Sequence, residues 1–119
     1  MSIDVTSVTR GMSLVVATIQ DQDVEAAGNA LTDKGFRFTR IGTTGGFLRQ
    51  GNTTLLVGVL TEYINEVVNL LNVASHRRHR YVPMATGMTP NGMTLYNYVE
   101  VEVGGATIFV LTVDHFEQV

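Results

Sequence analysis

The chain has 119 residues, of which 45% are hydrophobic and 16% charged, and its formal net charge at pH 7 is -3. This balance excludes a disordered chain and predicts one globular domain, while the low charged fraction indicates that other copies of the chain cover part of its surface. The absence of cysteine excludes disulfides and thiolate metal sites and favours a cytoplasmic location. No apolar stretch approaches the ~18 residues of a membrane-spanning helix, so we expect no direct membrane insertion.

The first third of the chain predicts an extension, a strand and a helix. Residues 1–12 have no hydrophobic periodicity and are expected to form a flexible N-terminal extension. The β-branched run SLVVATIQ at 13–20 is apolar on both faces, which is typical of a central strand. In the helix expected at 21–34, Asp23 is the candidate N-cap, and Gly35 follows where a helix end favours a left-handed residue.

The middle of the chain predicts two more strands and a second helix. FRFTRIGTT at 36–44 alternates at first, so that its two phenylalanines share one face and Arg37 and Thr39 share the other. TTLLVGVL at 53–60 is another apolar strand. Thr61 is the candidate cap of the following helix, whose apolar residues recur at helical spacing.

The last third predicts a long loop and a hairpin. Residues 75–97 begin with the basic run HRRHR and continue without a period, which predicts a long loop that is mobile or functional. VEVEV at 99–103 alternates strictly, Gly104-Gly105 is a two-residue hairpin signal, and ATIFVLTV at 106–113 is apolar on both faces. We therefore expect an extra hairpin strand before the last strand.

The order of these elements predicts an α+β fold. It is β-α-β-β-α-β over residues 13–119, with an extra hairpin strand, and this order is the ferredoxin-like split βαβ pattern. Two helices cover only one face of such a sheet, yet the strands at 14–19, 55–60 and 106–111 are apolar on both faces. We expect the other face to pack against further copies of the chain in a closed ring.

The basic residues are concentrated in two windows that contain no Asp or Glu, residues 34–61 and 67–99. Seven of the eight Lys and Arg residues lie there. Such segregation favours a discrete anionic ligand over a nucleic-acid track, so we expect no DNA or RNA partner. Solvated surface arginines are the alternative interpretation.

The glycine-rich stretch GFLRQGNT at 46–53 nearly fits a phosphate loop, but Asn52 stands where that motif needs lysine. A strand rather than a helix follows it, which excludes a nucleoside triphosphatase. The loop glycines can still present N–H groups to an anion, with Phe47 stacking on a base, Asn52 contacting a base edge and Arg37 reaching a phosphate. An ordinary hairpin loop is the alternative interpretation.

The sequence contains no catalytic or metal-binding motif. His76 and His79 are three residues apart, but only His115 could join them, and the neighbouring arginines repel cations. An acylphosphatase-like enzyme, which would share the topology, is disfavoured because the two carboxylates of QDQD at 20–23 would repel a phosphate. We expect no enzyme, no catalytic residue, no metal and no cofactor.

Four segments together resemble the PII-like cyclic di-AMP receptors of Gram-positive bacteria. They are VVATIQDQD (15–23), GFRFT (35–39), TTGGFLRQGNTTLLVGV (43–59) and VEVEVGGATIFVL (99–111). The resemblance spans nearly everything from Met12 to Val113. It implies a PII-like homotrimer of ferredoxin-like subunits that binds cyclic di-AMP in three clefts between neighbours and signals without catalytic activity.

The resemblance also implies a set of ligand-binding residues: Arg37, Thr39, Gly46, Phe47, Leu48, Asn52, Gly58 and Phe109. On the second strand, Arg37 and Thr39 would contact phosphate and ribose. The loop residues Gly46, Phe47 and Leu48 would lie against one adenine, with Asn52 at a base edge. Gly58 on the third strand and Phe109 on the last would complete the cleft. Gly35 stands where the family often has asparagine, and Thr112 replaces a common proline. The HRRHR segment has no match in the family.

We therefore expect a cytoplasmic, non-enzymatic receptor in which cyclic di-AMP orders the loop at 75–97 and an unknown downstream protein recognises the change. Two alternatives stay open. One is a PII-like trimer that binds ATP, ADP or another nucleotide, and the other is an interaction scaffold without a small ligand.

Overall fold

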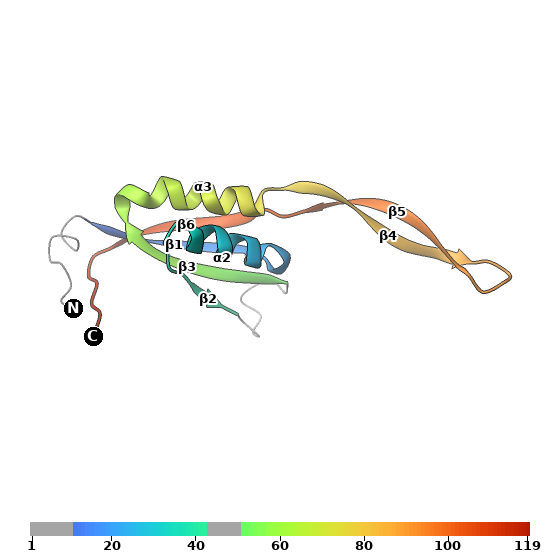
Figure 1. Ribbon diagram of the computed structural model, residues 1–119, viewed down its shortest axis with the longest axis horizontal. Helices are drawn as coiled ribbons and strands as arrows, with labels where there is room; N and C mark the ends of the chain where they lie inside the picture. Colours follow the sequence, from blue (N-terminus) through green and yellow to red (C-terminus); the bar gives the residue numbers. More distant parts are fainter. Residues whose placement is uncertain (1–10, 43–50) are drawn as a thin grey trace.

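The computed structural model describes residues 11–42 and 51–119, which form a body of one sheet and two helices and a long two-stranded ribbon that extends from it (Figure 1). The elements are β1 (Met12–Gln20), α2 (Val24–Asp33), β2 (Thr39–Ile41), β3 (Asn52–Leu60), α3 (Ile64–Ser75), β4 (Arg78–Met88), β5 (Thr94–Val103) and β6 (Ala106–Val113). The ribbon consists of β4 and β5, and it accounts for the elongated extents of 73 × 28 × 23 Å.

The strands of the body form an antiparallel sheet in the order β2-β3-β1-β6. With one helix after β1 and one after β3, this order is compatible with the predicted ferredoxin-like fold. The strands predicted at 13–20, 53–60 and 106–113 are confirmed to within one residue, whereas the described part of the strand predicted at 36–44 covers Thr39–Ile41. The extension predicted for residues 1–12 lies outside the described residues as far as residue 10, and Met12 belongs to β1.

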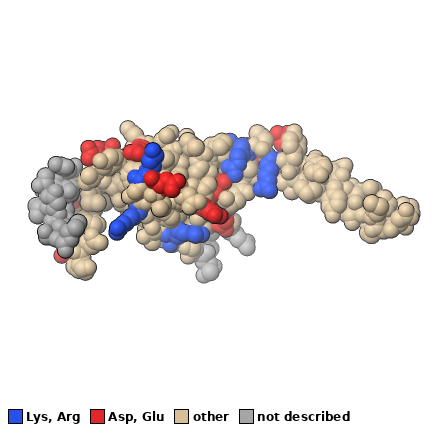
Figure 2. Space-filling model, in the orientation of Figure 1, with Lys and Arg blue, Asp and Glu red and all other residues tan. Residues whose placement is uncertain are grey.

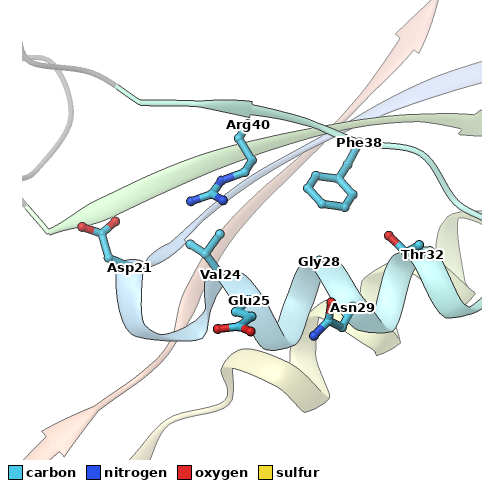
Figure 3. A pocket seen from close by; sticks show the side chains of 8 residues that line it. All are labelled: Asp21, Val24, Glu25, Gly28, Asn29, Thr32, Phe38 and Arg40. Carbon is cyan, nitrogen blue, oxygen red and sulfur yellow. The ribbon is translucent and has the colours of Figure 1, made fainter.

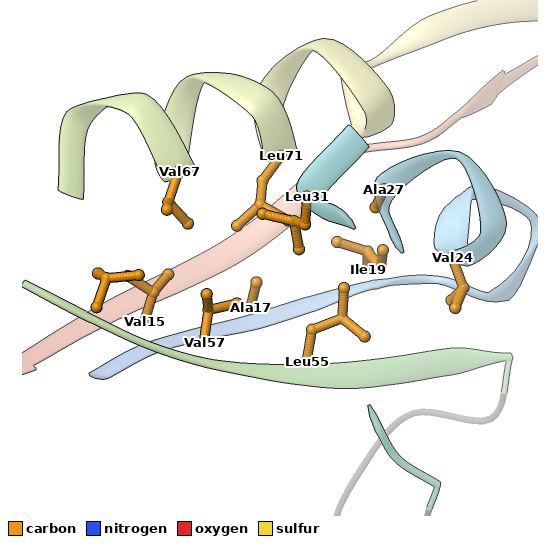
Figure 4. Packing of buried hydrophobic residues seen from close by; sticks show 11 residues of the cluster. Val15, Ala17, Ile19, Val24, Ala27, Leu31, Leu55, Val57, Val67 and Leu71 are labelled. Atoms are coloured by element: carbon orange, nitrogen blue, oxygen red, sulfur yellow. The ribbon is translucent and has the colours of Figure 1, made fainter. Parts of the chain in front are cut away.

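The hydrophobic core lies between the sheet and the two helices (Figure 4). Alternate residues of β1 point into it, and the predicted apolar stripe of the second helix contributes two fully buried side chains from α3. The buried apolar set is Val15, Ala17, Ile19, Val24, Ala27, Leu31, Leu55, Val57, Val59, Val67 and Leu71. Removal of this apolar surface from water is the main force that holds the body together.

Of the two predicted N-caps, Asp23 does stand at the N-cap position of α2 but makes no capping hydrogen bond, whereas the N-cap of α3 is Tyr63 and not Thr61. One turn of 3-10 helix precedes each α-helix, at Asp21–Asp23 and Thr61–Tyr63, and no side chain caps either helix. The carboxylate of Asp23 pairs with Arg78 instead, and the hydroxyl of Thr61 lies 3.0 Å from that of Ser13. The predicted helix end is confirmed, because Gly35 follows α2 with a φ of 81°.

The segment predicted as an aperiodic loop at 75–97 is largely a β-ribbon. β4 pairs with β5 in antiparallel register from Arg78↔Val103 to Met88↔Thr94, with an irregularity between Ala85 and Gly87. Both faces of the ribbon are exposed along most of its length, so its sequence has no contrast between a buried and a solvated face. A pattern search that depends on this contrast could not find β4 or the start of β5, although the alternation at 99–103 did predict the second half of β5.

The hairpin predicted at Gly104-Gly105 is also wrong, because β5 pairs with β4 while β6 pairs with β1. The two glycines instead carry the chain from the ribbon into the sheet, with φ values of 87° and 97°. A Cβ at Gly104 would collide with the carbonyl oxygen of His76, so the backbone passes there only as glycine. The predicted extra hairpin strand is thus one half of a separate ribbon.

A buried carboxylate fixes the root of the ribbon, which we define as residues 76–78 and 103–105. Arg78 donates from Nη2 to Oδ1 of Asp23 at 2.7 Å and from Nη1 to Oδ2 at 3.5 Å. The Asp23 side chain is 4% exposed and that of Arg78 is 36% exposed. The hydrogen bond to Asp23 raises the pKa of Arg78 above its ordinary value. Partial desolvation lowers this pKa, and the negative charge of the carboxylate raises it further. The pair ties the first residue of β4 to the turn before α2.

We expect Arg78→Ala to lower the melting temperature by roughly 5–10 °C, because it leaves the buried carboxylate of Asp23 without its cation. Asp23→Ala should cost less, since the half-exposed guanidinium that remains can be solvated. The matched control is Arg77→Ala, whose exposed ion pair should change the melting temperature by less than about 2 °C. Thermal unfolding followed by circular dichroism measures all three, and equal values for Arg78→Ala and Arg77→Ala would contradict the anchoring role.

Candidate functional site

The sheet has one face that neither helix covers, and the strand register places two predicted residues at its opposite edges. Thr39 pairs with Leu56, Leu56 with Val16, and Val16 with Phe109, so that one row crosses all four strands. Directly paired residues of an antiparallel sheet point to the same face. Thr39 on β2 and Phe109 on β6 therefore share the uncovered face.

Two more predicted residues lie on the same face of β3. Gly58 pairs with Leu14, and a Cβ added to Gly58 would meet no atom within 4 Å, so the surface above it is open. Asn52, at the other end of the strand, is half-buried and pairs with Gln20. That end of the sheet adjoins the root of the ribbon (Figure 1).

The alternation predicted after the first α-helix is confirmed. Phe36 and Phe38 pack against the core, whereas Arg37 and Thr39 are exposed. Arg37 lies two residues before the start of β2 and is thus available to a ligand at that edge of the sheet. The predicted loop residues Gly46, Phe47 and Leu48 lie outside the described residues.

A pocket of about 200 Å³ opens where Asn52 meets the root of the ribbon. The described residues around it offer the hydroxyls of Thr18 and Thr107, the amides of Gln20 and Asn52, and the guanidinium of Arg77, with no carboxylate. These groups can hydrogen-bond sugar hydroxyls and base edges, and the guanidinium adds a positive charge for an anion. The pocket therefore suits an anionic, hydroxyl-bearing ligand.

The sequence prediction missed Gln20 and Arg77. Gln20 Oε1 accepts a hydrogen bond from the N–H of Gly104 at 2.8 Å and another from Nε2 of Gln22 at 2.7 Å. Arg77 lines the pocket from the connection between α3 and β4. Four chain segments that are remote in sequence meet here, and the HRRHR run was the one local signal that pointed to this region.

A second pocket, of about 400 Å³, lies on the helix side of the sheet between α2 and β2 (Figure 3). Phe38 forms one wall against Gly28, where an added Cβ would come within 2.8 Å of the ring. The charged side chains of Arg40, Asp21 and Glu25 surround it and have opposite signs, so it does not select an anion. It also contains none of the predicted ligand residues.

Within residues 11–42 and 51–119, no three His, Cys, Asp or Glu side chains are grouped as metal ligands. Two histidines of the basic run have other neighbours: His76 Nδ1 lies 3.0 Å from the carbonyl oxygen of Val73, and His79 Nδ1 lies 3.3 Å from Oε1 of Glu100. In the same ranges, neither helix has the length and apolar character to cross a membrane.

The fold and the polar pocket indicate a ligand-binding protein, and the comparison with known families defines which kind. The family model of the cyclic-di-AMP receptor matches residues 12–119. The chain belongs to the cyclic-di-AMP receptor family, which confirms the resemblance found in the sequence, and a receptor is a binding protein rather than an enzyme.

The chain is also similar to a solved structure. The crystal structure of a functionally unknown protein from Pediococcus pentosaceus ATCC 25745 matches with 38% sequence identity and a TM-score of 0.72. The match covers 92% of this chain and 99% of that chain, so the similarity extends over nearly the whole length of both.

Proposed function

We propose that the protein is a cytoplasmic signal-transduction receptor, without enzymatic activity, that binds cyclic di-AMP in clefts between the subunits of a homotrimer. The observation that carries this proposal is the family match over residues 12–119. The strand register supports it, since four residues of the expected ligand set lie on the uncovered face of the sheet.

The apolar character of that face supports the trimer. Phe109 is 59% exposed and Leu111 is 51% exposed, and Leu14, Val16 and Leu56 lie beside them in the paired rows. A contiguous apolar patch on a chain this small is unfavourable in water. Packing of the sheets of three copies against one another would bury it without any new element.

The distance between the expected contacts supports a cleft shared by two subunits. Thr39 and Phe109 are separated by three strand spacings, roughly 14 Å, across one sheet. A cleft between neighbours would bring the β2 edge of one subunit next to the β6 edge of another. Arg37 would then bind a phosphate, Thr39 a ribose, and Asn52 a base edge, with Gly46, Phe47 and Leu48 against one adenine and Gly58 and Phe109 completing the cleft.

We propose that the ribbon transmits binding to a downstream protein. Because β4 and β5 already pair along most of their length, the ligand is not needed to form these strands. The ordering expected for residues 75–97 would instead change how firmly the ribbon is attached to the body. We expect cyclic di-AMP to slow amide hydrogen exchange at the root of the ribbon and along β5. Mass spectrometry with and without the ligand measures this, and unchanged protection across residues 75–103 would contradict the proposal.

We expect cyclic di-AMP to bind in a calorimetric titration, and Arg37→Ala and Asn52→Ala each to weaken it about tenfold. Both variants should keep the oligomer, for which light scattering should give three times the chain mass of 13.0 kDa. Titrations with ATP, ADP and cyclic di-GMP are the controls. Tighter binding of ATP or ADP would favour the other PII-type effectors, no binding of any nucleotide would favour a scaffold, and unaltered affinity in both variants would refute the site.

We expect Gly58→Val to abolish cyclic di-AMP binding while the subunit keeps its fold. The added side chain meets no atom of the described residues and suits a strand, so we expect it to conflict with a ligand or a neighbouring sheet on the uncovered face. The matched control is Gly87→Val, because Gly87 is also open but lies on the ribbon. Calorimetry and circular dichroism of both variants test this, and normal binding by Gly58→Val would place the ligand elsewhere.

A further inference from the structure

Two neighbouring arginines at the root of the ribbon are held in opposite ways. Arg78 makes one short hydrogen bond of 2.7 Å and one longer one of 3.5 Å to the buried carboxylate of Asp23. Arg77 is 79% exposed, and its Nε lies 3.8 Å from Oε1 of Glu102, which is itself 56% exposed. An exposed, long ion pair contributes little to stability. Arg77 can therefore exchange Glu102 for another anion at little cost, whereas Arg78 cannot leave Asp23.

Arg77 lies along the wall of the pocket that contains Asn52. A Cβ added to Gly105 would come within 3.3 Å of Cγ and 3.4 Å of Nε of Arg77, so the stem of the arginine runs close over the glycine backbone. Arg77 is the one cationic side chain among the described residues that line this pocket. A ligand that contacts Asn52 thus has the guanidinium of Arg77 in the same cavity.

The chemistry of the ligand requires a second cation. Cyclic di-AMP carries two phosphodiester groups, and each keeps one negative charge at neutral pH. In the proposed site Arg37 serves one phosphate from the β2 edge. The other phosphate needs its own counter-charge, because an anion that is partly removed from water without a partner is costly.

We propose that Arg77 is a further ligand-binding residue, which leaves Glu102 and binds a phosphate of cyclic di-AMP when the ligand occupies the pocket beside Asn52. This inference rests on the proposed function. The exchange is favourable because a guanidinium forms stronger, paired hydrogen bonds with a phosphate in a partly enclosed pocket than with an exposed carboxylate. Since Glu102 belongs to β5, the exchange removes a contact within the ribbon and couples occupancy of the pocket to the way the ribbon is held.

The test is calorimetric titration of the full chain with cyclic di-AMP at low and high salt. We expect Arg77→Gln to weaken binding about fivefold and to reduce its salt dependence. We expect Glu102→Gln to strengthen binding about twofold, because it removes the carboxylate that competes for Arg77. The matched control is Arg80→Gln: Arg80 donates to Oε1 of Gln22 at 3.3 Å, does not line the pocket, and should leave the affinity unchanged.

The outcomes separate this inference from the proposed function. A wild-type protein that fails to bind cyclic di-AMP contradicts the proposed function. A wild-type protein that binds, with an Arg77→Gln variant of equal affinity and equal salt dependence, overturns the role of Arg77 alone. Weaker binding by Arg77→Gln without any gain from Glu102→Gln overturns the exchange. If Arg77→Gln does not fold, Arg77→Lys takes its place, since it keeps the charge but loses the paired hydrogen bonds to a phosphate, and an unchanged affinity of Arg77→Lys would overturn the role of Arg77.

Discussion

A four-stranded sheet has two faces, and α2 and α3 cover one of them. The central strands are nonetheless apolar on both faces, and Phe109 and Leu111 expose their side chains on the uncovered one. Most of the other features follow from this constraint. Gly58 leaves a gap in the face, the expected ligand residues of β2 and β6 lie at its two edges, and a further copy of the sheet is the simplest cover.

The regular part of the fold could be predicted because its residues have one buried and one solvated side. The phenylalanines at 36 and 38 alternate with Arg37 and Thr39, and both the sequence and the structure show it. Most of the ribbon lacks such a contrast, so β4 and the start of β5 were predicted as a loop, whereas the alternation at 99–103 did predict the second half of β5. The capping contacts expected of Asp23 and Thr61 did not form for a different reason: these side chains contact Arg78 and Ser13, in distant segments that no local pattern contains.

The candidate site could be predicted to a similar extent. Asn52 was proposed from the glycine-rich stretch and Thr39 through the resemblance, and the strand register places both on one face. Gln20 and Arg77 were not found, because their pocket forms only when the end of β1, the start of β3 and the two ends of the ribbon meet. The number of charges in the basic run could not tell which arginine has which role. Arg78 neutralises Asp23, Arg80 contacts Gln22 and Arg77 lines the pocket.

The root of the ribbon relates the pocket to the rest of the molecule. Gln20, Gln22 and Asp23 each form hydrogen bonds to the ribbon or its root, so a shift at the end of β1 is transmitted directly to β4 and to Gly104.

Beyond the root, residues 81–99 contain no charged residue, and Figure 2 shows the outer half of the ribbon without Lys, Arg, Asp or Glu. A two-stranded ribbon is marginally stable in water by itself, and its exposed tyrosines, Tyr81, Tyr96 and Tyr98, combine an apolar ring with a hydroxyl. The unpaired edges of β4 and β5 need hydrogen-bond partners, which another protein can supply and lipid cannot. The ribbon is therefore the surface that the proposed downstream protein would gain most by covering.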